Sequence, residues 1–224
     1  MMHLKLRLVF PGLLAVLALA PVACGGNLTS GGLSDVEVFV AGNDPGENGG
    51  ATATAAAPLV LPLDAPVPAE ARASGLPMAT GTILGTVTVV LQVELMGSDR
   101  RWVQITDGPQ AVTVGLTGTN RSLLAARPLG AGRYIRARTT FLRVEAEVEQ
   151  GLVVEGEEVT GTIPVELPLA GLRVEEGLFL ELEEGDPGRL VVALNSQLWL
   201  RLVNANLRRV PQSIFQQAVR IRVF

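Results

Sequence analysis

The chain has 224 residues, with 18 basic and 22 acidic side chains, a net charge of −4 and 48% hydrophobic residues. Its acidic balance argues against general nucleic-acid binding, so we expect no nucleic-acid partner. Because His3 is the only histidine and Cys24 the only cysteine, the part after Cys24 cannot build Ser-His-Asp or Cys-His catalytic sites or a zinc site from those ligands.

The first 23 residues have the order of a secretory signal peptide. Residues 1–7 carry the charges, residues 8–20 form an almost wholly apolar signal helix, and residues 21–23 are Pro-Val-Ala before Cys24. This order predicts export. A cysteine at the cleavage position resembles the lipobox of bacterial lipoproteins, which implies that Cys24 is lipidated and holds the chain on a membrane, periplasmic or at the cell surface. Pro21 departs from the usual leucine, so secretion with an unmodified cysteine is the alternative.

Residues 24–58 are interpreted as a tether and low-complexity linker. A Gly/Asn/Ser-rich segment follows Cys24, and residues 51–58 contain only Ala, Thr and Pro, compositions typical of flexible linkers. Within this stretch Leu33–Val40 alternates in polarity and predicts a short strand. We expect the folded domain at residues 59–224. After the signal peptide, no apolar run approaches the ~20 residues of a membrane-spanning helix.

The domain has the period of two that half-buried strands show. A strand is predicted between residues 86 and 95 with Val87, Val89, Leu91, Val93 and Leu95 on its buried face. Residues 101–106 and 111–116 predict a hairpin across Asp107-Gly108-Pro109. In residues 133–148 the apolar phase shifts by one residue at Phe141–Leu142, which predicts a β-bulge or a crossing between sheets.

The C-terminal third continues with short strands. Prolines in residues 162–169 favour an edge strand, residues 178–182 alternate, and residues 189–203 predict a long strand interrupted at Asn195-Ser196. Residues 204–217 leave room for a helical turn, and residues 219–223 form the closing strand. About eight or nine short strands with frequent turns predict an all-β fold, an antiparallel β-sandwich.

Four segments and the chain end resemble a bacterial domain of unknown function, number 4382. They are Leu61-Pro62-Leu63-Asp64-Ala65-Pro66, Val87–Glu94, Trp102-Val103-Gln104-Ile105, Leu129–Tyr134 and the terminal Val-Arg-Ile-Arg-Val. The resemblance covers about residues 59–224 and implies a prealbumin-like or immunoglobulin-like sandwich in a signal-bearing or lipid-anchored protein. It implies no activity. Pro62 replaces the family's usual threonine.

Acidic residues gather beside the turn that follows residue 183. Hard oxygen ligands at a loop suit calcium, so Glu183, Glu184 and Asp186 are a candidate metal site; a solvated strand face is the alternative. A pair of opposed carboxylates for glycoside hydrolysis needs a separation of roughly 5–10 Å, which the sequence does not reveal. The cluster consists of Glu175, Glu176, Glu181, Glu183, Glu184 and Asp186.

Basic and aromatic residues supply the other candidates. Arg208, Arg209, Arg220 and Arg222 are a candidate patch for an anionic glycan, a lipid headgroup or a partner protein, with outward strand and loop arginines as the alternative. Trp102 and Trp199 either form a sugar-stacking platform or fill the core. Tyr134, after Gly-Arg, resembles a corner tyrosine that bonds the backbone, and Gly130 and Gly132 are turn glycines.

These observations predict a lipid-anchored cell-envelope protein that is not an enzyme and acts as a binding or structural module. Its expected partners are the membrane, through Cys24, and a glycan or an envelope protein. No cofactor is expected unless calcium binds. The alternatives are an envelope hydrolase that uses carboxylates alone and a calcium-stabilised adhesin-like domain.

Overall fold

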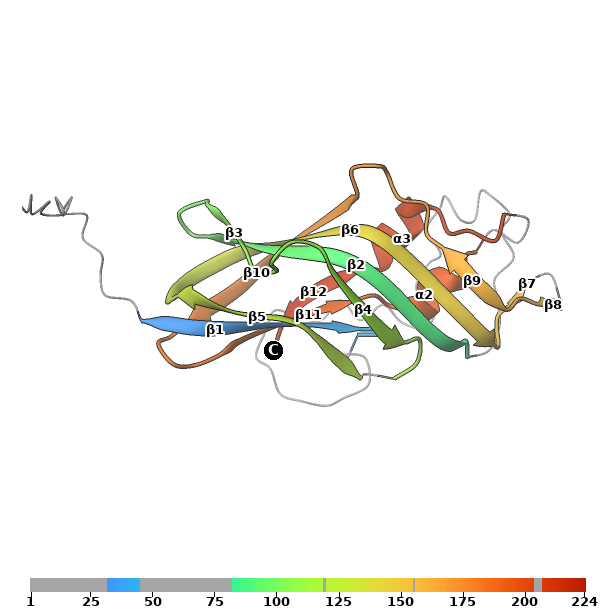
Figure 1. Cartoon of the computed structure of the whole chain (residues 1–224), viewed down its shortest axis with the longest axis horizontal. Helices are drawn as coiled ribbons and strands as arrows, with labels where there is room; N and C mark the ends of the chain where they lie inside the picture. Colours follow the sequence, from blue (N-terminus) through green and yellow to red (C-terminus); the bar gives the residue numbers. More distant parts are fainter. Residues whose placement is uncertain (1–31, 45–81, 119, 155, 204–206) are drawn as a thin grey trace, which may run out of the picture. The chain divides into compact units, whose positions relative to one another are not determined.

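The computed structural model describes residues 32–44, 82–118, 120–154, 156–203 and 207–224. They form an all-β sandwich, which confirms the predicted fold class (Figure 1). Sheet 1 has the strand order β12-β11-β1-β5, and its strands are β1 (Leu33–Ala41), β5 (Arg121–Gly130), β11 (Gly188–Ala193) and β12 (Arg220–Val223).

Sheet 2 has the strand order β10-β6-β2-β3, with β4 beside β2 and β9 beside β6. The short strands β7 and β8 pair with each other. With β7 and β8 included, the described residues contain twelve strands, whereas eight or nine were expected. The strands are β2 (Leu84–Gly97), β3 (Trp102–Gln104), β4 (Gln110–Gly115), β6 (Gly132–Gln150), β7 (Val153–Val154), β8 (Glu157–Glu158), β9 (Gly161–Pro164) and β10 (Leu172–Leu182).

Strand β1 lies in the interior of sheet 1, so the expected domain boundary at residue 59 is wrong. The strand predicted there exists, but it belongs to the fold and not to a linker. It pairs in parallel with β11 from Val36 to Ala41 and antiparallel with β5 along its whole length. Sheet 1 is therefore mixed and not wholly antiparallel. Val36, Val38 and Val40 of β1 are fully buried.

The hairpin expected between residues 101–106 and 111–116 is not formed. Strands β3 and β4 both pair antiparallel with β2, at Glu94–Met96 and at Thr86–Leu91 respectively. They are two pieces of one interrupted edge strand, and the hairpin turn lies earlier, between β2 and β3. At the interruption, Val93 bonds Thr106 and Ile105, because its N–H donates to the Thr106 hydroxyl (3.2 Å) and its carbonyl accepts from the Ile105 N–H (2.8 Å).

The bulge predicted at Phe141–Leu142 is confirmed. Val90 pairs with Arg143 and Leu91 with Phe141, so Leu142 is the extra residue. The Leu142 side chain is 40% exposed, whereas Phe141 and Val144 on either side are buried. A bulge lets one strand follow two apolar phases. The 19-residue strand β6 can thus keep most of its apolar side chains in the core on both sides of the bulge.

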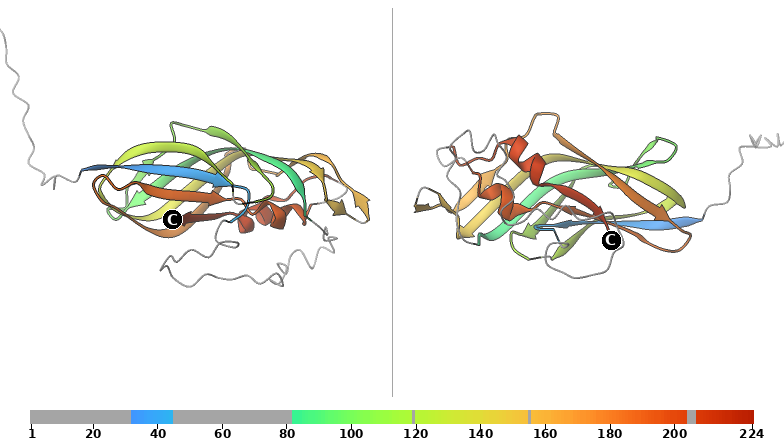
Figure 2. Two further views of the ribbon diagram at one scale, coloured as in Figure 1. Left: turned by 90° about the horizontal axis from the view of Figure 1, so that it is seen from below. Right: turned by 180° about the vertical axis from the view of Figure 1, so that it is seen from behind.

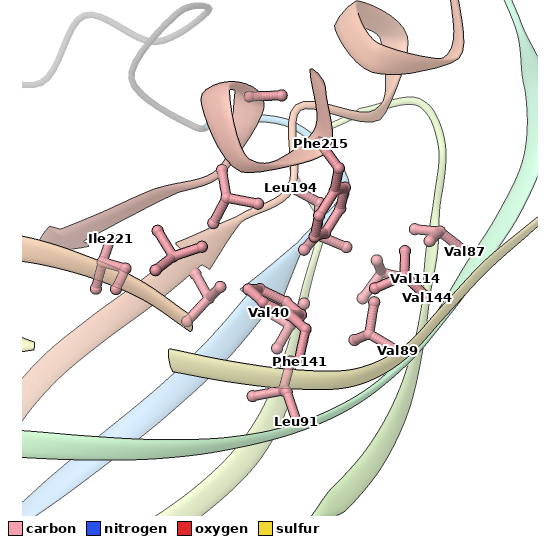
Figure 3. Packing of buried hydrophobic residues seen from close by; sticks show 14 of the residues in the cluster. Val40, Val87, Val89, Leu91, Val114, Phe141, Val144, Leu194, Phe215 and Ile221 are labelled. Carbon is pink, nitrogen blue, oxygen red and sulfur yellow. The ribbon is translucent and has the colours of Figure 1, made fainter. Parts of the chain in front are cut away.

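The core lies between the two sheets. All five residues predicted for the buried face of β2, Val87, Val89, Leu91, Val93 and Leu95, are fully buried, which confirms the facing of this strand. They belong to one cluster with the inward valines of β1 and with Leu190 and Val192 of β11. Figure 3 shows these layers meeting near Phe141 and Phe215.

Two short helices, α2 (Ser196–Leu200) and α3 (Gln212–Ala218), lie beside each other near β9 (Figures 1 and 2). The Phe215 ring packs edge-on against Trp199 (5.5 Å between centroids) and Phe141 (5.1 Å). The strand expected over residues 189–203 is wrong beyond Ala193, since α2 follows there. The helical turn expected within residues 204–217 is confirmed by α3.

Two polar side chains at the start of α2, Asn195 and Gln197, form hydrogen bonds to chain segments that are remote in sequence. Asn195 adopts φ +49°, a conformation that asparagine tolerates. Its amide oxygen accepts from the Asp44 N–H (2.9 Å), and its amide nitrogen donates to the Ala218 carbonyl (2.6 Å). The Gln197 side chain bonds both the N–H (3.0 Å) and the carbonyl (2.7 Å) of Ile83. The chain just after β1 and the chain just before β2 are thus held by two side chains that lie two positions apart, Asn195 and Gln197.

Substitution of Gln197 tests this clamp. Gln197→Ala leaves the Ile83 N–H and carbonyl without these bonds, and an unsatisfied group of this kind costs about 1–3 kcal/mol. We expect the free energy of unfolding to fall by that amount in urea denaturation. The matched control is Leu198→Ala, because the neighbouring Leu198 side chain is 47% exposed; its change should stay near 0.5 kcal/mol. Equal losses in the two variants would contradict the clamp.

Candidate functional site

The outer face of sheet 1 carries an apolar layer. Ala41, Val191 and Ala193 form a second buried cluster outside the main core, and Phe39 packs against it. The Phe224 ring lies edge-on to Phe39, 5.9 Å between centroids. Alternation explains the arrangement, since odd-numbered residues of β1 point away from the buried Val36, Val38 and Val40. Unlike most solvated sheet faces, this one therefore has an apolar centre.

Three large apolar side chains form what we term the central patch: Phe39, Leu123 and Phe224. Leu123 pairs with Phe39 across β5 and β1 and is 55% exposed. Phe224 is 45% exposed, and the Arg121 guanidinium lies 3.9 Å from its ring centroid. Exposed aromatic residues beside arginine are the composition found in protein interfaces. These three residues are a candidate contact surface that the sequence alone did not indicate.

Opposite charges lie at the two ends of this face. Asp35 and Glu37, two outward residues of β1, form the acidic end. Arg121 and Arg220 form the basic end, because they occupy the rows of Ala41 and Ala193.

A shallow depression opens at the acidic end. Its volume is about 450 Å³, and Leu33, Ser34, Asp35, Glu37, Gly185 and Pro187 line it. Asp35 is exposed, whereas Glu37 pairs with Arg189 (3.0 Å). The Ser34 hydroxyl donates to the Asp186 carbonyl and ties the start of β1 to the turn before β11. The depression thus offers an accessible carboxylate on a fixed backbone.

The arginines expected to form one anion patch are mostly engaged within the chain. Arg222 pairs with the buried Asp44 (2.6 Å), and Arg209 pairs with Glu166 (3.3 Å). Arg220 donates to the carbonyls of Gln217 and Val219, each at 2.7 Å. Arg208 is exposed, with φ +47°. Three of the four arginines therefore have partners within the chain, and the anion patch stays a prediction.

The expected calcium ligands do not come together. Within the described residues no three His, Cys, Asp or Glu side chains are close enough to hold a metal ion. Glu183, Glu184 and Asp186 are exposed around the β10–β11 turn, so their carboxylates stay hydrated. The rest of the acidic cluster is divided between the faces of β10: Glu175 contacts Arg138 on the outside (3.8 Å), while Glu176 points inward.

Glu176 bridges the two sheets at the β10–β12 seam. Its carboxylate accepts a hydrogen bond from the Ile221 N–H on the free edge of β12. Burial raises the pKa of Glu176; the Ile221 bond and the charges of Arg220 and Arg222 oppose the shift, and Asp44 adds to it. Since desolvation is the largest cause, the pKa of Glu176 is higher in the native state than in the unfolded chain.

The aromatic candidates have structural roles. Trp199 is fully buried, and its indole N–H donates to the Leu194 carbonyl (3.1 Å). Trp102 is half-buried, and the Arg138 guanidinium lies 4.2 Å from its ring centroid. Arg138 also pairs with Glu94 (2.7 Å), so one face of Trp102 is occupied. The Tyr134 hydroxyl donates to the Gly130 carbonyl (3.1 Å), which confirms the corner tyrosine.

Comparison with protein-family models, curated proteins and solved structures finds no match to this chain. The resemblance to the domain of unknown function therefore stays a sequence-based expectation. Cys24 and the signal sequence lie outside the described residues. Among the described residues, no helix is long and apolar enough to cross a bilayer.

The raised pKa of Glu176 predicts how stability depends on pH. A group whose pKa is raised in the native state stabilises the fold below its unfolded-state pKa, and this stabilisation disappears as the pH rises through the native value. Glu176→Gln keeps an acceptor for Ile221 but does not titrate. Relative to the natural chain, the variant should therefore gain stability in urea denaturation as the pH rises above the ordinary carboxyl value of 4.5. Glu175→Gln, on the outer face, is the control and should lack this gain. A Glu176→Gln variant that loses relative stability toward pH 8 would contradict the assignment.

Proposed function

We propose that the chain is an exported, lipid-anchored protein of the cell envelope whose β-sandwich is a non-catalytic binding or structural module. The observation that carries the proposal is the N-terminal order of charged residues, an apolar run and small residues directly before Cys24. The described residues of the domain begin at Gly32. The chain between these two points spans at most about 30 Å, so a lipid on Cys24 would keep the domain near the membrane.

The outer face of sheet 1 supports the binding part of the proposal. Its central patch exposes large apolar side chains next to Arg121, a composition that favours contact with another molecule. The face is built on strands in the body of the sandwich, so it is presented on a fixed backbone. Of the two expected classes of partner, a glycan and an envelope protein, the apolar composition of this face favours a protein.

The two alternatives set out from the sequence gain no specific support in the described residues. Three carboxylates of the acidic cluster considered for a hydrolase have partners within the chain: Glu175 pairs with Arg138, Glu181 pairs with Arg133, and Glu176 accepts from the Ile221 N–H. Glu183, Glu184 and Asp186 do not assemble as a ligand set for calcium. The module is therefore the function we put forward.

Metabolic labelling with a fatty acid tests the anchor. The natural chain should incorporate label and sediment with membranes, whereas Cys24→Ala should do neither, because the thiol is the site of attachment. A matched control, Cys24→Ala with Ser30→Cys, restores a cysteine six positions away. It should stay unlabelled, since modification depends on the position after the small residues. A natural chain without label, or a labelled control, would refute the lipid anchor.

A further inference from the structure

We propose that the outer face of sheet 1 is a homodimer interface, on which a second copy of this chain packs face to face. The proposal starts from the central patch. Phe224 and Leu123 are about half exposed, and both adjoin Phe39. Full burial of an exposed side chain of this size contributes roughly 1.5–3 kcal/mol. Because these side chains are about half exposed, about half of that remains to favour association. The charges around the central patch indicate that its partner is a second copy of the chain.

The face is self-complementary in charge along its strands. The exposed Asp35 lies at one end, and Arg121 and Arg220 lie at the other. A two-fold axis in the plane of the interface and perpendicular to the strands reverses the strand direction of the second copy. Each acidic end then meets a basic end, and the central patches meet each other. Isologous dimers require this kind of self-complementarity.

The depression at the acidic end gives this arrangement a receptor. Asp35 lies on its lining. Arg121 stands in the row of Ala41, whereas Asp35 pairs with Pro128. Reversal of the strands brings the Arg121 of one copy over Pro128 of the other, which is the cross-strand neighbour of Asp35. The Arg121 guanidinium of one copy is then in reach of the Asp35 carboxylate of the other. By symmetry, this contact occurs twice in the dimer.

The size of the face sets the expected strength. Four strands and the six-residue length from Asp35 to Ala41 give roughly 20 Å by 20 Å from the usual strand spacing and rise. Two such faces bury roughly 800 Å² in total, which is below the roughly 1,200–2,000 Å² of stable specific interfaces and in the range of weak, transient contacts. We therefore expect a weak, reversible dimer that forms where the chain is concentrated.

Cross-linking of the full chain tests the proposal. In Leu123→Cys, a thiol on the central patch should react with a short bismaleimide and give a band of twice the monomer mass. Leu169→Cys, on a fully exposed position between β9 and β10, is the control and should give monomer. The natural chain shows how much cross-linking arises from Cys24. A free Cys24 thiol would therefore count against the lipid anchor and leave the dimer test intact.

Charge reversal identifies the partner as a second copy. In the Leu123→Cys background, Arg121→Glu should reduce the dimer fraction by about tenfold, as loss of an interface hot spot does. Asp35→Arg should do the same, and the double reversal Arg121→Glu with Asp35→Arg should restore the dimer. Failure of this restoration would overturn the proposed pairing.

Two further results would overturn the dimer and redirect the assignment of the face. A Leu123→Cys thiol that reacts with a monofunctional maleimide but never cross-links would mean that the face is free and serves another partner. A thiol that resists both reagents in a chain that remains folded would mean that the chain itself covers the face.

Discussion

The structure depends on the position of β1 between β5 and β11. This strand is separated from its partners by long stretches of sequence, since Val36 pairs with Arg127 on one side and Gly188 on the other. Its inward valines enter the main core, and its outward residues carry the second apolar cluster and the central patch. Loss of β1 would leave β5 and β11 with free edges facing each other, which is a hazard for aggregation.

The same strand joins the proposed anchor to the proposed interface. The segment after Cys24 leads directly into β1, and the acidic end of the outer face lies on the first residues of that strand. The far end of β1 is held by the bond from the Asp44 N–H to Asn195 and by the ion pair between Asp44 and Arg222. A domain attached to a membrane through β1 is therefore attached through an interior strand, and not through a fraying edge.

Charged groups in this fold act mainly as links between elements. Arg138 joins three strands of sheet 2 through Glu94 and Glu175, and Glu176 joins sheet 2 to β12. Because the Glu176 carboxylate accepts from the Ile221 N–H, neither group is left without a hydrogen bond at the edge of β12. These links explain why many acidic and basic residues grouped by sequence position are not available as one site.

The sequence was sufficient for features that depend on local periodicity. The facing of β2, the bulge at Leu142 and the corner bond of Tyr134 follow from alternation or from short spacing. It was insufficient where long-range pairing decides: β3 and β4 prefer β2 to each other, and β1 pairs with strands more than 80 residues away. The apolar run around Trp199 was assigned to a strand because a short buried helix and a buried strand have similar composition.

The site was harder to anticipate for the same reason. Phe39, Leu123 and Phe224 lie far apart in the sequence and meet only when β5, β1 and β12 align. Asp44 and Arg222 come from opposite ends of the domain. No periodic signal joins such residues, whereas the apolar outward positions of β1 and β11 are visible as a departure from alternation once the sheet is known.

Native-state hydrogen exchange of the full chain tests the central position of β1 most directly. If β1 is an interior strand, the amides of Val36 to Ala41 exchange only through global unfolding, with the same free energy as the core amides of β2 and β6. Exchange of these β1 amides as fast as an unstructured segment, while β2 and β6 stay protected, would show that β1 is part of the tether and would contradict the account.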